Sequence, residues 1–512
     1  MTGRAGRLVW FLLVTVPLGA LVLAALRLAV PRPEVMALAL PTGRRWTLLV
    51  TTVVLAGGVA VVATALGFLG ALTLATGRAG RHRLLRWLPV LLAPLPPYVH
   101  ALAWNDALGW LAGVITGGGA PPPASGPGMV LWVETMAVLP ITTALGLVGI
   151  LNLPRPSVEA ARLHRADPVV LGRVVLPLAA PFLAASAGLA FLLVATAHDV
   201  PSLHAVTTFP LEIFAEFSAG HDAARATILA LPALVVSVLV LALVIPALRR
   251  ARVGTTGGLA GIAWRWPAWF RGLQGVVAAV LAAQFLVPVV SLAARPGSWK
   301  GVVSGLTLAG PELGFSLIVA ASAAVLAIPL ASALARGLRS PLWWVLAFVP
   351  LAVPAPLVGI ALLAVFNPVL PMVLLDSPLL PVLAALLRFT PFATFVLLAG
   401  LRRRQRDRID AVRVFQPGPL AGWVGVRLHL EAPTVLAASG FVFALSLGEL
   451  GATLLVLPPG RSTLAIRISN YLHYGAAQDV RGLCLVLLVV TTVTGLGVAA
   501  LVSRGAAGRP AA

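Results

Sequence analysis

The sequence predicts an all-α membrane protein that crosses the bilayer about twelve times, because a crossing helix needs about 20 apolar residues. Hydrophobic residues make up 59% of the 512 residues, charged residues only 10%, and the mean hydropathy is +0.99. A backbone in lipid must satisfy its own hydrogen bonds, so apolar runs of this length indicate helices rather than barrel strands. The predicted spans lie near 8–30, 47–76, 87–106, 128–152, 177–199, 226–248, 272–294, 313–335, 342–366, 379–400, 431–456 and 482–503.

The placement of basic residues predicts the orientation of the chain. The formal net charge is +21, and most of the 37 basic residues fall on one set of alternating loops. Lys and Arg are enriched in loops on the inner side of a membrane, so both termini are expected inside the cell. The charge therefore reflects topology, and binding of nucleic acid is not expected. The predicted inner segments are 1–7, 77–86, 153–176, 249–271, 336–340, 401–427 and 504–512.

The chain contains an internal repeat with an offset of about 251 residues, as in tandem architectures. EAARLHRADPVVLGRVVLPLAAP (159–181) matches DAVRVFQPGPLAGWVGVRLHLEAP (410–433), and Pro140 matches Pro391. An even number of spans in each copy keeps the two copies parallel, which is a common plan among transporters. We therefore expect an N-terminal half at 1–250, a linker at 251–271 and a C-terminal half at 272–512.

Each half carries a compact charged block between two predicted spans. In the first block, 153–177, Ser157 is a candidate helix cap that places Glu159 in the first helical turn,. Asp167 followed by Pro168 is a second helix-start signal,. The block thus predicts a helix, a sharp turn and a second helix, suited to docking another protein, and the alternative is a plain solvated connector. The second block repeats the pattern around Asp407, Asp410 and Gly418-Pro419.

Glu159-Ala160-Ala161 followed by Leu176-Pro177 resembles the EAA loop of ATP-binding-cassette importer permeases. The resemblance covers the whole chain as two fused halves of six spans, and it is most similar to permeases of the ferric-iron and thiamine type. It implies a type I importer permease fold in the bacterial inner membrane. It also implies two partners, a cytoplasmic ATPase dimer that docks on both loops and an extracytoplasmic substrate-binding protein. The resemblance assigns ATPase coupling to Glu159, Ala160, Ala161, Arg162, Arg165, Asp167, Pro168, Asp410, Ala411, Arg413, Gly418 and Pro419.

The second block departs further from the family pattern than the first. Arg165 and Gln416 stand where the family usually has glycine. Asp410 and Val412 replace the motif Glu and second Ala, and Leu428-His429 replaces Leu-Pro. These differences put the contacts of the second loop in question.

The chain is not expected to be an enzyme. A P-loop needs a lysine that reaches the phosphates, and Lys300, in an outer loop, has no such context,. The single cysteine, Cys484, can form no internal disulfide, and no pattern of metal ligands is present,. No cofactor or metal is expected in this chain, and ATP with magnesium is expected on the partner ATPase.

Four ionisable residues within predicted spans are candidates for the translocation pathway: Glu134, Asp199, Arg388 and Glu449. Such groups are costly in lipid, so they tend to be paired or functional. Asp199 and Glu449 occupy nearly equivalent positions of the two halves, and Arg388 is a candidate partner of Glu449. The alternative is that Asp199 and Glu449 are ordinary helix-end residues. His198, His204, His221 and His473 are expected to be solvated loop residues.

The predicted function is import of a small solute through the junction of the halves. Ferric iron is the first expectation, and thiamine, sulfate, phosphonate and polyamine remain open. Two other classes also remain open, a secondary transporter driven by an ion gradient and a membrane scaffold that transports nothing.

Overall fold

The computed structural model describes residues 3–76, 95–117, 125–250, 259, 262–294, 298–402, 429–474 and 477–507. All regular structure within these ranges is helical, so the predicted all-α class is confirmed. Nine helices of the described chain are long and apolar enough to cross a membrane, or ten if one bent pair is a single span. The chain is therefore a multi-pass membrane protein.

The helices of the first half follow one another in the order predicted. Their bounds are α1 Gly3–Ala29, η1 Pro33–Ala39, α2 Arg44–Thr76, α4 Pro97–Thr116, α5 Pro127–Leu151, α6 Arg155–His164, α7 Asp167–Val170, η3 Leu171–Val175, α8 Leu176–Ala195, α9 Asp199–Leu203, α10 Phe209–Gly220 and α11 Ala223–Arg250. Among these, α4 is too polar to pass as a span by composition.

The second half begins at α12 and has the same general order. Its bounds are α12 Ala268–Ala293, α13 Ser298–Leu308, α14 Gly310–Gly337, α15 Pro341–Phe348, η4 Val349–Ala352, α16 Ala355–Phe366, α17 Met372–Leu375, α18 Leu379–Arg402, α21 His429–Leu447, α22 Thr453–Val456, α23 Leu464–Tyr474 and α24 Ala477–Ala507. The predicted span at 342–366 is broken, because α15 with η4 meets α16 at 105°. Each predicted run overlaps a described helix, although α4 extends ten residues beyond the predicted end of the run 87–106, and the total of twelve crossings stays a prediction.

Four helices pack in the same arrangement in each half. In the first half α8 contacts α2, α5 and α11, and in the second half α21 contacts α14, α18 and α24. Pro140 lies inside α5 and Pro391 lies inside α18, at matching places of the two sets. The largest buried apolar cluster draws side chains from both sets, so the two halves share one core.

The first helix of each half packs against the other half. In α1, the fully buried Trp10 donates its indole N–H to the carbonyl of Leu346 in α15, at 2.9 Å. The Arg7 guanidinium lies over the ring of Trp343, 5.5 Å from its centre. Correspondingly, α12 packs on α2 and α4 of the first half. This exchange joins the halves along their length.

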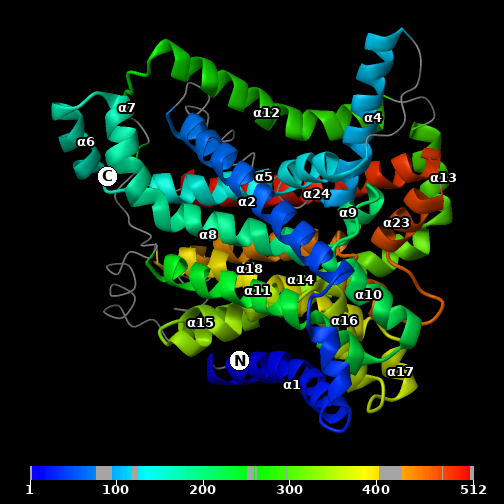
Figure 1. The fold of residues 1–512 in the computed structure, drawn as a ribbon. Helices are drawn as coiled ribbons and strands as arrows, with labels where there is room; N and C mark the ends of the chain where they lie inside the picture. The colour runs from blue at the N-terminus through cyan, green and yellow to red at the C-terminus, as the bar shows by residue number, and fades with distance from the viewer. Residues whose placement is uncertain are drawn as a thin grey trace.

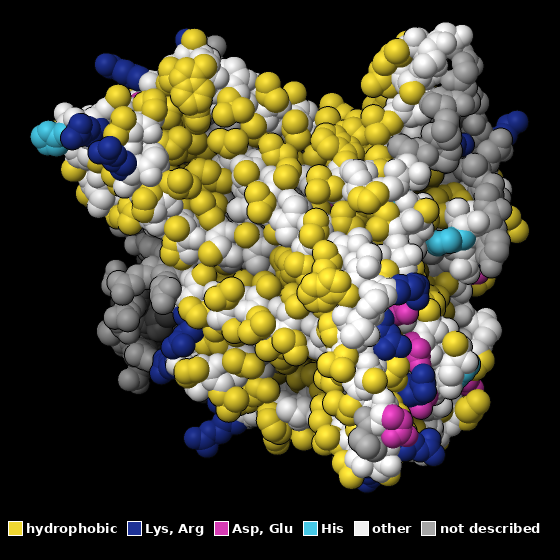
Figure 2. Space-filling view, in the orientation of Figure 1, with side chains coloured by type: hydrophobic (Ala, Val, Ile, Leu, Met, Phe, Trp, Pro, Cys, Tyr) yellow, Lys and Arg dark blue, Asp and Glu magenta, His cyan; other side chains and the backbone are white. Residues whose placement is uncertain are grey.

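The surface and the positions of the chain ends are consistent with a membrane protein whose two termini lie on the same side of the bilayer. In Figure 1 both ends of the chain lie on the side of α6 and α7, opposite α10, α17 and α23. Hydrophobic side chains cover the middle of the face in Figure 2, while basic side chains appear over α6, and acidic side chains gather near the opposite edge together with further basic ones. The apolar middle surface matches lipid, because span-length helices turn apolar side chains outward there.

Candidate functional site: a helix–turn–helix loop and a buried polar cluster

The first charged block folds as a helix, a turn and a second helix between the spans α5 and α8. Helix α6 begins at Arg155, with Pro154 as the residue before it, so Ser157 lies inside the helix and is not its cap. The expected cap was wrong because proline favours the first helical positions, and α6 begins three residues earlier than a cap at Ser157 would give,. Glu159 still lies near the helix start, where its carboxylate accepts a 2.7 Å hydrogen bond from Arg155.

The turn between α6 and α7 is closed by an ion pair. Helix α7 begins at Asp167 as predicted, yet the Asp167 side chain caps no helix. Its carboxylate instead accepts two hydrogen bonds from Arg162, at 2.7 and 3.2 Å. It also accepts the backbone N–H of Arg265, from the linker between the halves. A bidentate pair of this kind fixes direction as well as distance, so it sets the angle between the two short helices.

The outer face of α6 offers an unpartnered apolar surface. Leu163 is 82% exposed, far more than a helical leucine that packs on its own protein. Glu159, Ala160, His164 and Arg165 are exposed around it, and Val158 is the residue of α6 buried against the loop's inner side. The helix therefore exposes one apolar side chain, surrounded by charged residues, on the surface of the loop.

The second charged block lies outside the described residues. The predicted coupling residues Asp410, Ala411, Arg413, Gly418 and Pro419 all fall within 403–428. Their role stays a prediction from the sequence.

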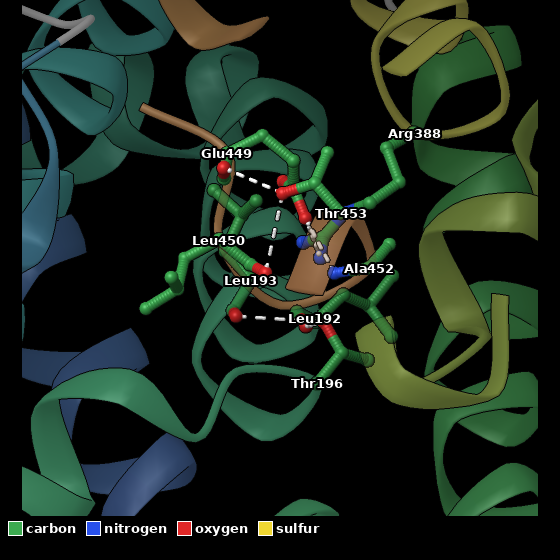
Figure 3. A network of polar contacts seen from close by, with 8 residues as sticks. All are labelled: Leu192, Leu193, Thr196, Arg388, Glu449, Leu450, Ala452 and Thr453. Atoms are coloured by element: carbon green, nitrogen blue, oxygen red, sulfur yellow. Dashed lines mark hydrogen bonds and ion pairs between the residues drawn. The ribbon is translucent and has the colours of Figure 1, made fainter. Parts of the chain in front are cut away.

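A buried polar cluster lies where the two halves meet. Arg388, in the middle of α18, donates to the Glu449 carboxylate at 3.1 Å, so the predicted partners are in contact. The same oxygen of Glu449 accepts the backbone N–H of Ala452 at 2.8 Å, and the Thr453 hydroxyl donates to the Glu449 carbonyl (Figure 3). Glu449 is buried at 6% exposure, which argues against an ordinary helix-end residue at the membrane surface.

The turns that follow α8 and α21 reach across to the opposite half. The carbonyl of Thr196, after α8, accepts the backbone N–H of Ala355 at the start of α16, at 3.1 Å. On the other side, Gly448 after α21 lies directly against Pro96, the residue before α4. Both helices that these turns meet begin after a proline, Pro354 and Pro96. The contacts therefore repeat across the junction and hold each proline-started helix from the other half.

Glu134 and Asp199 lie near this cluster but form no hydrogen bond with Arg388 or Glu449 among the described contacts. Glu134 in α5 is 2% exposed, and its Oε1 atom has no hydrogen-bond partner in the described structure. Asp199 begins α9, and its charge acts on Glu134 while the Arg388 charge acts on Asp199. The four predicted pathway residues thus occupy one region, with the ion pair at its centre.

The cluster includes groups that the sequence reasoning missed. His198 and His204 were expected to be solvated but are buried at 6% and 1% exposure, because the turn after α8 packs into the junction. Tyr98 and His100 in the first turn of α4 are also fully buried, and their polar ring atoms lack partners in the described structure. The signal available was the proline run before α4, which marks a broken helix inside the protein.

The chain is similar to known transport-system permease proteins over less than half of its length. No family model matches the chain. Over 246 residues, covering 44% of this chain and 92% of the relative, it is 28% identical to "Putative 2-aminoethylphosphonate transport system permease protein PhnV" of Salmonella typhimurium. The same identity and coverage hold for the protein of that name from Salmonella choleraesuis, and Salmonella typhi has one that is 27% identical. With the multi-pass helical fold, this similarity to a transport-system permease protein supports a membrane permease.

Proposed function

We propose that this chain is the membrane permease of an ATP-binding-cassette importer, with two permease halves in one polypeptide. The observation that carries the proposal is the α6–α7 loop, a short helix with an exposed Leu163 held between two spans. The permease similarity supports it further, because nearly the whole of PhnV aligns with less than half of this chain. Two such units in tandem account for the length, with the division near residue 250.

The proposed location is the bacterial inner membrane, with both termini in the cytoplasm. The positive-inside bias of the loops supports this orientation. The position of both chain ends on the side of α6 and α7 supports it as well (Figure 1). The loop then faces the cytoplasm, where an ATPase is available, and α10 and α23 face a substrate-binding protein outside.

The proposed coupling works through the two loops. In the first loop, Glu159, Ala160 and Leu163 are exposed and would contact the ATPase, while Arg162 and Asp167 hold the turn. Closure of the ATPase dimer around ATP and magnesium would draw both loops together and turn the bundle outward. The conformational shift is limited by the difference in nucleotide affinity between the two states. This chain would hold no cofactor of its own.

The proposed pathway runs through the junction of the halves. Arg388 and Glu449 come from the second half, Asp199 and Glu134 come from the first, and all four line one region. The turns after α8 and α21 cross this junction, so a change in the angle between the halves would move them. Buried polar groups at the junction give the route its chemical selectivity.

For the solute, the relatives favour a phosphonate over ferric iron. PhnV is named for 2-aminoethylphosphonate, a molecule with one cationic and one anionic group. The junction holds a basic group, Arg388, beside several carboxyls, which can interact with groups of both signs. Ferric iron, the first expectation from the sequence, has no comparable support, and thiamine, sulfate and polyamine remain alternatives.

A secondary transporter driven by an ion gradient is the second candidate. The observation that favours it is the pair of carboxyls Glu134, which is buried, and Asp199, which is partly exposed, since neither is bonded to a basic side chain in the described contacts. Carboxyls of this kind carry protons or cations in transporters of that class.

Reconstitution separates the candidates. The chain is placed in liposomes with candidate ATPase subunits, and both ATP turnover and uptake of 2-aminoethylphosphonate are measured. Uptake that requires ATP supports the proposal, and Glu159→Lys with Asp410→Lys should abolish association with the ATPase. Uptake that follows a proton or sodium gradient without ATP would overturn it in favour of the second candidate.

A further inference from the structure

The linker between the halves does more than connect them, because part of it lies on the first coupling loop. The linker segment, defined as Ile262–Pro267, forms no helix or strand and lies directly before α12. Two side chains of the loop bind its backbone. Arg162 Nη2 donates to the carbonyl of Ala263 at 2.6 Å, and the Asp167 carboxylate accepts the N–H of Arg265.

The spacing of these two bonds matches the edge of an extended chain. In extended backbone the carbonyl of one residue and the N–H two residues later point to the same side. Arg162 and Asp167 are themselves joined by two hydrogen bonds. The ion pair and the linker segment therefore form one hydrogen-bonded unit, in which Asp167 serves both the turn and the linker.

Aromatic rings of the linker cover the other side of this unit. The Arg162 guanidinium lies over the Trp264 ring at 5.0 Å, within range of a cation–π interaction,. Trp264 stacks on Trp266 at 4.8 Å with nearly parallel rings, and Trp266 contacts Phe270 at 4.4 Å. Leu259, Ile262 and Phe270 are buried in the same apolar cluster as Val158, Val170 and Val175 of the loop region. The inner face of the loop thus packs on the linker.

The linker segment is in turn attached to the helix bundle. Trp266 Nε1 donates to the Thr76 hydroxyl, at the end of α2, at 3.3 Å. Gln274 in α12 reaches the same hydroxyl at 3.4 Å. Because α12 is the first helix of the second half and packs on α2 and α4, a path of contacts runs from the junction of the halves to α6.

We propose that the linker segment positions the first coupling loop, with Arg162, Asp167 and Trp264 as positioning residues. In this role they couple the position of α12 to the position of α6, so that a movement of one half relative to the other also moves the loop. The inference rests on the proposed importer function. It adds that the covalent connection between the halves is itself a part of the coupling route.

The first test measures the mobility of α6 without any partner. A spin label is attached to Leu163→Cys in the full chain, where the native Cys484 is 0% exposed and does not compete. Trp264→Ala and Asp167→Asn should each raise the label's mobility about twofold or more, since they remove contacts that order the loop. Arg271→Ala is the control, because Arg271 is exposed at the start of α12 and has no side-chain bond among the described contacts. Unchanged mobility in both variants overturns the proposal.

A charge exchange distinguishes the linker from the ion pair. Arg162→Asp with Asp167→Arg keeps opposite charges in the turn, but it places an acceptor where Arg162 donated to the Ala263 carbonyl and a donor where Asp167 accepted the Arg265 N–H. We expect the mobility of the label to remain high in this double variant. A return to the wild-type value would mean that the ion pair alone positions α6, which would also overturn the proposal.

The second test measures coupling in the reconstituted complex. Trp264→Ala leaves the exposed face of α6 unchanged, so association with the ATPase should persist. The solute moved per ATP hydrolysed should fall about three- to tenfold, the range produced by changes along a coupling route. Normal coupling with a mobile loop would overturn the positioning role. If wild type binds no ATPase, the proposed function fails, and the spin-label result still decides whether the linker positions the loop.

Discussion

The backbone N–H of Ala355 donates to the carbonyl of Thr196, and this bond joins the two halves of the chain. Ala355 begins α16 directly after Pro354, and Thr196 directly follows the last residue of α8. The contact places a turn of one half on the first residue of a broken helix of the other. Gly448 and Pro96 make the corresponding contact in the opposite direction. The junction is therefore built from two similar turn-to-helix contacts, and the Arg388–Glu449 pair lies beside them.

Replacing one member of the Arg388–Glu449 pair should lower the stability of the protein much more than replacing both members with apolar residues. Glu449→Ala leaves the partly buried Arg388 guanidinium without its carboxylate, and because breaking a fully buried pair costs about 3–5 kcal/mol, the loss should approach the lower end of that range,. It should also lower uptake while insertion in the membrane stays normal. Thermal unfolding in detergent and solute uptake are the measurements. Arg388→Leu with Glu449→Leu should recover most of the stability, and equal losses for the single and double variants would contradict a paired role.

Gly448 should not tolerate a methyl group. A Cβ at this position would overlap the ring of Pro96, so Gly448→Ala should cost about 1–3 kcal/mol by overpacking and weaken the contact between the halves,. Gly275→Ala is the matched control, because nothing lies within 4 Å of the added atom and alanine favours a helix,. Thermal unfolding of the two variants compares them. A Gly448→Ala variant with wild-type stability and full uptake would show that the close contact between Gly448 and Pro96 is not needed at the junction.

Trp10 should anchor α1 to the second half. Trp10→Ala removes a fully buried ring and its hydrogen bond to Leu346, and comparable core truncations cost about 3–5 kcal/mol,. Leu12→Ala on the same helix is the control, since Leu12 is 48% exposed. Protease resistance of α1 in detergent gives a second measurement. Equal effects of the two substitutions would argue against the crossed packing of α1.

Leu163 should matter for ATPase association and not for folding. Leu163→Asp places a charge on a surface position that is 82% exposed, so the fold should be unchanged. If the side chain enters an ATPase groove, affinity should fall about tenfold or more, as for other interface anchors. Arg271→Ala serves as the surface control. Binding is measured by pull-down with purified ATPase. Equal binding of wild type, Leu163→Asp and Arg271→Ala would show that α6 is not part of the docking surface.

Uptake driven by ATP should survive collapse of the proton gradient. In the proposed mechanism the energy comes from nucleotide binding, so an uncoupler should not change the initial rate in ATP-loaded liposomes. The buried Glu134 and the partly exposed Asp199 make this a necessary measurement, because intramembrane carboxyls serve ion-driven transporters,. A rate that falls with the gradient, and that no longer does so in Glu134→Gln, would favour the secondary transporter.

Much of the fold could be predicted from the sequence, because its signals are local. The apolar run 128–152 is as long as a membrane-spanning helix requires, and it forms α5 at Pro127–Leu151,. The Asp167-Pro168 step predicted a helix start, and α7 begins there. Local signals misplaced the start of α6, where Pro154 and Pro156 outweigh the capping potential of Ser157,.

The candidate site was predictable only in part. Arg388 and Glu449 stood out because ionisable groups in apolar runs need partners, and they are paired,. The burial of His198 and His204 could not be predicted, since nothing local shows that the turn after α8 enters the junction.

The sequence by itself determined the all-α membrane class of this protein, its apolar helices and the repeat of its charged blocks, and it predicted the side of the membrane on which its loops lie. These follow from hydropathy, charge and spacing, which act within one segment at a time. The tertiary structure decided which helices exchange between the halves, that Thr196 meets Ala355, and that the linker lies on Arg162 and Asp167. Those contacts join residues about one hundred or more positions apart, and they depend on how complete helices pack, a property that no single segment encodes.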